Sequence, residues 1–354
     1  MMQAARMARP WIPWNWLNIM RSSPTRSRFG ACKAVVFAKL ALILCLILTF
    51  TTLPSCRANR AEIAVITTTN KEAEHEGAES AARGLGLRIR WRESSRENDV
   101  ESQIELVDRA VSDRYRGLIL TPTQPTALMV PIQRALAAGV RIVVAGATLP
   151  LPPQRNLSYI VNDDEVIGGM AARRVDDVLH GRGEVAAVGI DPYSLNSLAI
   201  LGSFVSAIEQ HFPKISVVDR RAATSSDLDC ELVVNQVLLS HPHVGAIFAL
   251  DWRATIGTYY ALNTRSLASR IKIVGVQQTE ELANAIRLHQ IDSIIAEDGY
   301  QMGYQAVEAF AHGEAKSPGM LKLAPMLITA DNVDSTAARP FLIFVRPSGW
   351  RSDY

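Results

Sequence analysis

Short apolar runs rich in β-branched residues alternate with helical stretches, and this alternation constrains the fold more than any other sequence feature. Residues 62–67 predict a strand, 72–85 a helix, and 87–91 a second strand. Apolar residues then recur at helical spacing over 100–115, before the buried strand expected at 117–121. Strands that alternate with helices in this way are typical of βαβ units and a parallel sheet.

The same pattern starts again after residue 162. A helix over 166–179 precedes a strand over 184–190, and the series continues to a last helix at about 300–312. Two such series predict an α/β chain with two doubly wound parallel-sheet lobes. Ligands of these folds lie at the carboxyl ends of the strands, so a cleft between the lobes is the expected binding site.

The first 55 residues have the parts of an export signal. Residues 21–39 are basic, 40–50 form an uninterrupted apolar run, and a cleavage-like segment follows at 53–56. Because an apolar run of this length is short for a membrane span, we expect a signal peptide over 1–55. A permanent anchor helix over 34–53 is the alternative. Met20 is a second possible start.

The basic character of the chain belongs to this leader. The whole sequence has 37 basic and 35 acidic residues, a net charge of +2, and seven of the basic residues lie in 1–55 without an acidic one. The remainder, from Cys56 onward, therefore carries −5. The whole-chain charge therefore says nothing about the partners of the exported part, for which we expect no nucleic acid.

Cysteine positions point to lipid modification. Leu53-Pro-Ser-Cys56 resembles the bacterial lipobox, although a plain cleavage site containing a cysteine is also open. Two other cysteines lie in the leader, which leaves Cys230 in a helical run as a small buried apolar residue. These observations predict an exported lipoprotein of the periplasm or cell envelope, anchored to the membrane through Cys56.

Six segments of the exported part carry a family resemblance through their order and spacing. They are 117–124, 137–144, 161–169, 241–248, 273–276 and 327–334. In these segments the chain resembles the type I periplasmic-binding-protein family, which includes ribose- and galactose-binding proteins and shares the core of LacI-type repressors. The resemblance covers about 62–335.

The resemblance implies a monomeric receptor without enzymatic activity that delivers a small solute, a sugar or polyol, to the permease of an ABC importer. It implies no cofactor and no metal. Such a fold has a three-strand hinge, expected near 161–163, 296–298 and 323–327. The implied N-terminal lobe is 61–161 plus about 298–324, the C-terminal lobe is 162–297 plus about 325–335, and the tail is 336–354, in which 341–345 is a candidate edge strand.

The resemblance implies candidate ligand contacts at the positions that match the family's strand ends, where hydroxyl groups need hydrogen bonds and sugar rings stack on flat side chains. The candidates are Thr69, Asn70, Thr121, Asp164, Tyr193, Asp251, Trp252, Gln277 and Glu297. Structural roles stay open for four of them. Asp251 and Gln277 are candidate helix caps, Trp252 is a candidate packing residue, and Glu297 is a candidate ion-pair partner.

The aspartate and arginine that the family uses for sugar hydroxyls have no counterparts here, since their positions fall at 145–146 and near Leu198. A cation, and a degenerate receptor with a non-sugar ligand, therefore stay open. So does a sensor that docks on a membrane receptor kinase or chemoreceptor. A repressor requires a helix-turn-helix where the leader lies, and an enzyme requires a nucleophile–base or metal motif that the sequence lacks. His241 and His243 lie in a proline turn before a strand, which predicts no metal site.

Overall fold

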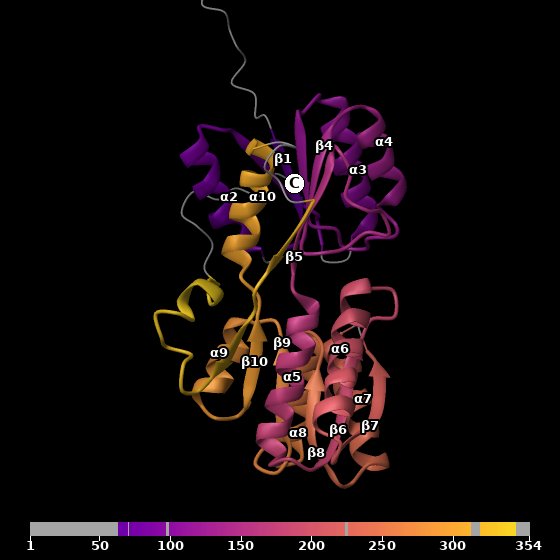
Figure 1. Ribbon diagram of the computed structural model, residues 1–354, viewed down its shortest axis with the longest axis vertical. Helices are drawn as coiled ribbons and strands as arrows, with labels where there is room; N and C mark the ends of the chain where they lie inside the picture. Colours follow the sequence, from indigo (N-terminus) through magenta and orange to yellow (C-terminus); the bar gives the residue numbers. More distant parts are fainter. Residues whose placement is uncertain (1–62, 70, 97–98, 224–225, 313–318, 345–354) are drawn as a thin grey trace, which may run out of the picture. The chain divides into compact units, whose positions relative to one another are not determined.

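The computed structural model describes most of the chain after the leader, and its strands form two sheets (Figure 1). The described residues are 63–69, 71–96, 99–223, 226–312 and 319–344. The predicted signal peptide, Cys56 and Asn70 lie outside them. Within these ranges no helix has the length and apolar character needed to cross a bilayer.

The first sheet has six strands in the order β11-β5-β4-β3-β1-β2, and all neighbours run parallel. Its strands are β1 (Ile63–Thr67), β2 (Ile89–Glu93), β3 (Gly117–Leu120), β4 (Arg141–Ala145), β5 (Leu157–Asn162) and β11 (Met320–Leu323). Its helices are α2 (Glu72–Leu85), α3 (Val100–Ser112), α4 (Met129–Ala137) and α10 (Gly299–His312). Successive residues of a strand face opposite sides. Accordingly, Ile63 and Val65 pack with α2 and α10, whereas Ala64 and Ile66 pack with α3 and α4.

The second sheet has the order β12-β10-β9-β8-β6-β7, in which only β12 runs antiparallel to its neighbour. Its strands are β6 (Gly183–Ile190), β7 (Ile215–Ala222), β8 (Val244–Ala249), β9 (Lys272–Val276), β10 (Ser293–Ala296) and β12 (Met326–Thr329). Its helices are α5 (Asp164–Leu179), α6 (Leu195–His211), α7 (Asp227–Ser240), α8 (Trp252–Thr264) and α9 (Glu280–Arg287). One face packs on α5 and α6, and the other packs on α7, α8 and α9. The predicted α/β class with two parallel-dominated sheets is confirmed.

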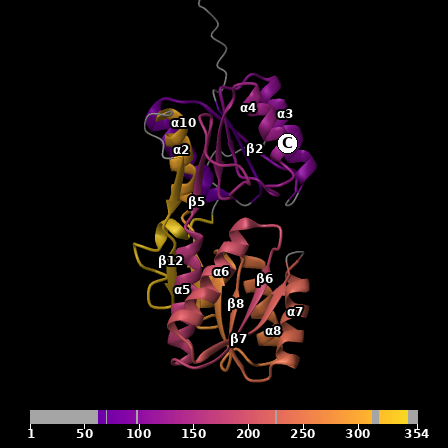
Figure 2. The same cartoon turned by 45° about the vertical axis from the view of Figure 1, so that its right-hand side comes forward.

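Two glycines allow the backbones of α2 and α10 to touch. Figure 2 shows the two helices side by side. A Cβ atom on Gly77 would lie 1.9 Å from the carbonyl oxygen of Tyr300, and one on Gly303 would lie 1.9 Å from the carbonyl oxygen of Glu74. Only residues without a side chain allow this approach. The first turn of α2 is therefore held beside α10, which begins two residues after Glu297.

The apolar run predicted as an edge strand at 341–345 is not a strand in its described part. Arg339–Phe341 forms a 3-10 helix, η1, and residues 342–344 have no regular structure. Pro340 has no N–H to give to a sheet. The backbone N–H of Phe341 instead donates to the Ala338 carbonyl at 3.0 Å. Cys230, in contrast, is buried on α7, as predicted, and its thiol donates to the Ala223 carbonyl at 3.4 Å.

Candidate functional site

Polar residues that follow strands of both sheets line one pocket of about 470 Å³, which we call the inter-sheet pocket. Thr68 and Thr69 follow β1, Gln277 and Gln278 follow β9, and Glu297 follows β10. The complete lining is Thr68, Thr69, Lys71, Glu72, Ala73, Glu74, Trp252, Gln277, Gln278, Thr279, Glu280, Glu297, Gly299, Ile343 and Phe344. The carboxyl ends of parallel strands are where open α/β sheets bind ligands.

Glu74 contributes a buried carboxylate from the first turn of α2. Lys71 lies 2.8 Å from one carboxylate oxygen, and the Thr121 hydroxyl donates to the other at 3.1 Å. Glu74 is only 6% exposed. A buried carboxylate with two such partners is fixed in direction and stays compensated in charge.

Glu297 is held by amide groups on its main chain and its side chain. The side-chain oxygen of Gln278 accepts from the Glu297 N–H at 3.0 Å, and Gln278 Nε2 donates to the Glu297 carbonyl at 2.8 Å. Gln277 Nε2 donates to the Glu297 carboxylate at 3.5 Å. Desolvation raises the pKa of Glu297, and the Lys71 charge and the hydrogen bond from Gln277 oppose that rise. A carboxyl group with a raised pKa can offer a ligand hydroxyl either a donor or an acceptor.

Gln277 also has an unusual backbone. Its φ is 65°, in the left-handed region that few residues other than glycine, asparagine and aspartate adopt. Strained backbone of this kind persists where the surrounding structure requires it, and it is enriched at ligand sites. Glycine would adopt this conformation more easily, but the residue between β9 and the pocket is a glutamine, whose side chain can bond to Glu297.

Asp164 lies outside the pocket lining, in a chain of hydrogen bonds that joins segments of the two sheets. Asn196 Nδ2, on α6, donates to Asp164 Oδ2 at 2.8 Å, and Asn196 Oδ1 accepts from the N–H of Thr148 at 3.1 Å. Thr148 lies between β4 and β5, which belong to the first sheet. Desolvation and the nearby Glu297 charge raise the pKa of Asp164 to about 7.

The structure brings four of the predicted contacts together and places the others elsewhere. Thr69, Trp252, Gln277 and Glu297 line the inter-sheet pocket. The remaining described candidates do not line it. Thr121 donates to Glu74, and Asp164 accepts from Asn196. Tyr193 is 83% exposed, and Asp251 is the N-cap of α8. The Asp251 carboxylate accepts from the Ala254 N–H at 2.7 Å, and burial raises its pKa to about 6.

Several lining residues escaped the sequence argument. Lys71 and Glu74 lie at the start of a predicted helix, where charged residues are typical of an exposed face. Only the contact between α2 and α10 shows that these two side chains face the pocket. Asn196, which bonds Asp164 outside the pocket lining, lies at the start of the run 196–211 that the sequence predicts as a helix. Gln278 follows Gln277 in sequence, and this adjacency to a strand end was the one available signal. Phe344 belongs to the run 341–345, which the sequence suggested as an edge strand and not as part of a pocket.

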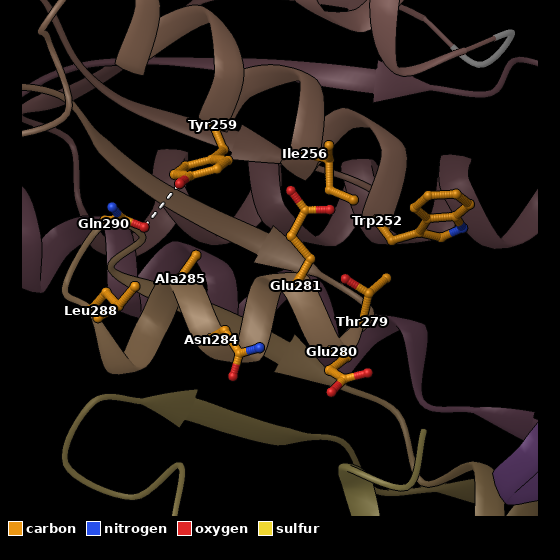
Figure 3. Close-up of a pocket in the computed structure, with 10 residues that line it drawn as sticks. All are labelled: Trp252, Ile256, Tyr259, Thr279, Glu280, Glu281, Asn284, Ala285, Leu288 and Gln290. Atoms are coloured by element: carbon orange, nitrogen blue, oxygen red, sulfur yellow. Dashed lines mark hydrogen bonds between the residues drawn. The ribbon is translucent and has the colours of Figure 1, made fainter. Parts of the chain in front are cut away.

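A second hollow, the α8–α9 groove, lies between two helices of the second sheet (Figure 3). Its volume is about 650 Å³, and it is open along its length. The hydroxyl of Tyr259 donates to Gln290 at 2.9 Å across one end, and Leu288 is exposed nearby. Since helices of one sheet alone form this groove, the inter-sheet pocket is the better candidate ligand site.

Metal-ligand geometry is missing from the described residues, which hold no group of three or more histidine, cysteine, aspartate or glutamate side chains able to bind an ion. In the inter-sheet pocket, Glu74 bonds to lysine and threonine side chains, and Glu297 bonds to a glutamine side chain. This arrangement is suited to hydrogen bonding with hydroxyl groups.

The chain is similar to curated proteins and to solved structures. The D-allose-binding periplasmic protein of Escherichia coli is 22% identical over 73% of this chain and 85% of that protein. The xylitol-binding protein of Mycolicibacterium smegmatis is 22% identical over 73% of each chain. An ABC transporter solute-binding protein from Agrobacterium vitis, solved with α-D-tagatopyranose, has a TM-score of 0.73 and 21% identity, covering 80% of this chain and 99% of its own.

The family profile described as periplasmic binding protein domain matches residues 63–312, which include every strand of the two sheets except the last pair, β11 and β12. The match therefore spans the strand ends that line the inter-sheet pocket. This chain belongs to the periplasmic binding protein domain family.

Proposed function

We propose that the protein is a solute-binding receptor that holds a small sugar or polyol in the inter-sheet pocket and delivers it to an ABC importer. The observation that carries the proposal is the convergence of polar strand ends from both sheets on one pocket. Its volume of about 470 Å³ is in the range of small-molecule sites. The names of the relatives, which mention D-allose and xylitol, support the same ligand class. The relatives are binding proteins, which supports a receptor without enzymatic activity.

The pocket charges favour a neutral ligand over an anionic one. Four glutamates line the pocket, and Lys71 is the single basic residue among its lining residues. Sugar acids and sugar phosphates would meet these carboxylates in a partly desolvated space, which costs like-charge repulsion. Hydroxyl groups, in contrast, donate well to carboxylates.

Two lobes that close on the ligand complete the proposal. The N-terminal lobe comprises 61–161 and about 298–324, and the C-terminal lobe comprises 162–297 and about 325–335. A ligand that contacts residues of both lobes stabilises the closed state through its differential affinity. The monomeric state follows the sequence expectation.

Export and anchoring form a separate part of the proposal. A signal peptide over 1–55 and a lipid on Cys56 would place the receptor in the periplasm, tethered to the membrane. In that case Cys56→Ser releases the protein into the soluble fraction of fractionated cells. Cys230→Ser is the matched control and leaves the distribution unchanged. Equal membrane retention of both variants rejects the lipid anchor.

A thermal-shift panel of D-allose, D-ribose, xylitol and D-glucuronate tests ligand binding. A ligand at 100 times its Kd stabilises the folded state by about 2.7 kcal/mol, which raises Tm by roughly 4 °C in a chain of this size, because the unfolding entropy is about 2.1 cal/mol/K per residue. We expect such a rise with at least one neutral compound and none with glucuronate. Gln277→Ala reduces the rise, and Leu288→Ala, in the α8–α9 groove, leaves it intact. Absence of any rise, or an equal rise with glucuronate, contradicts the proposal.

A further inference from the structure

The segment after β12 is firmly attached to the second sheet. Val333 and Ala338 are buried in the core between that sheet and α7, α8 and α9, at 3% and 0% exposure. Asp334 accepts from Arg287 of α9 at 2.8 Å. Phe341 packs on the same core. The path of the chain up to η1 is therefore set by apolar burial.

Beyond this attachment the segment turns toward the strand ends. η1 lies against α10, the helix that begins just after Glu297, and the next residues, Ile343 and Phe344, line the inter-sheet pocket. Phe344 is partly buried against the core of the second sheet. One side of the pocket is thus formed by a segment that follows the last strand of the fold.

Phe344 supplies an apolar ring that the pocket otherwise has only in Trp252. Thr68, Thr69 and Lys71, which follow β1, bring no aromatic side chain. The guanidinium of Arg253 lies over the Trp252 ring, 4.3 Å from its centroid, and covers one face of that ring. A sugar ring presents a face of C–H groups as well as hydroxyl groups, and aromatic side chains bind such amphipathic surfaces.

From this arrangement we propose that Phe344 is a ligand-contacting residue that stacks on the apolar face of the bound sugar or polyol. The inference rests on the proposed function. If Phe344 filled the pocket, Phe344→Ala would tighten ligand binding, whereas loss of a residue that forms one wall weakens it. The geometry favours a wall, because about 470 Å³ stays open with Phe344 in place. That volume is within the range that small ligands occupy.

The test compares Phe344→Ala, Phe344→Tyr and Phe341→Ala by calorimetric titration with the compound from the D-allose, D-ribose and xylitol panel that most raises the Tm of the unaltered chain. We expect Phe344→Ala to weaken binding about tenfold and Phe344→Tyr to stay within about threefold. Phe341→Ala removes a ring of the same size that does not line the pocket. It lowers Tm and leaves the affinity unchanged.

Amide hydrogen exchange without any sugar gives an independent measurement. If Phe344 covers the pocket, Phe344→Ala speeds exchange at 277–280 severalfold, and Phe344→Tyr does not. Wild-type affinity in Phe344→Ala, tighter binding in that variant, or unchanged exchange each overturns the proposal. A chain that binds no compound of the panel contradicts the proposed function. Exchange at 277–280 then still decides whether Phe344 forms the wall.

Discussion

The carboxyl group of Asp164 makes the stability of the protein depend on pH. Desolvation and the Glu297 charge raise its pKa from 3.8 to about 7, while the hydrogen bond from Asn196 opposes the rise. Between these two values the folded protein binds more protons than the unfolded chain. The contribution of Asp164 to stability is therefore complete below pH 3.8 and is lost as the pH rises toward 7.

The size of the loss follows from the two pKa values. At 1.36 kcal/mol for each pH unit, the difference corresponds to about 4 kcal/mol. Asp164 is partly exposed, so solvent screening reduces the expected loss to about 2 kcal/mol. Asp164→Asn removes the titration and keeps an oxygen that accepts from Asn196. At high pH, Asp164→Asn is therefore more stable than the wild type. The variant also loses a favourable negative charge in the first turn of α5, which reduces this difference by less than about 1 kcal/mol.

Urea denaturation at half-unit steps from pH 4 to pH 8 measures this effect. The free energy of unfolding of Asp164→Asn minus that of the wild type should grow by about 2 kcal/mol over this range. Asp177→Asn, which removes a charge from the same helix at a side chain that is 66% exposed, is the control variant for the change in net charge. A flat curve for Asp164→Asn, or one that falls with pH, refutes the assigned protonation of Asp164.

Further predictions concern helix contacts. Gly303→Ala places a Cβ 1.9 Å from the Glu74 carbonyl oxygen and lowers the unfolding free energy by about 1–3 kcal/mol in urea titrations. Gly202→Ala, where nothing lies within 4 Å, leaves it unchanged or raises it by up to about 1 kcal/mol. Asp251→Ala removes the cap of α8 and costs about 1 kcal/mol, whereas Asp251→Ser keeps a capping oxygen and the sugar-dependent rise in Tm. Loss of that rise in the serine variant would make Asp251 a ligand contact.

The sequence predicted the parts of the site that depend on strand order. Gln277 and Glu297 directly follow β9 and β10, and the carboxyl ends of neighbouring parallel strands meet at one edge of a sheet. The family resemblance pointed to both residues, and the order of the strands explains why they lie together. The same rule also suggested Asp251, whose oxygen is taken by the N–H of Ala254. Strand order gives the neighbourhood of a residue and leaves open which partner its side chain takes.

Residues that reach the pocket from elsewhere could not be predicted in this way. Glu74 points to the site because α2 and α10 touch through Gly77 and Gly303, a contact between helices more than 200 residues apart in sequence. Phe344 reaches it because Val333 and Ala338 are buried in the second core. Both placements depend on packing between distant segments, which sequence periodicity does not contain.

The order of strands in the first sheet has a consequence for synthesis on the ribosome. Its edge strand β11 and its helix α10 come from residues after 298, whereas β6 to β10 of the second sheet lie within 183–296. A nascent chain can thus assemble most of the core of the second sheet before α10 has been made. Until then, the face of the first sheet that packs against Met302, Val307 and Phe310 of α10 stays uncovered. The sheet that is translated first is therefore completed only after β6 to β10 of the second sheet have been made, so folding cannot proceed simply from the N-terminus to the C-terminus.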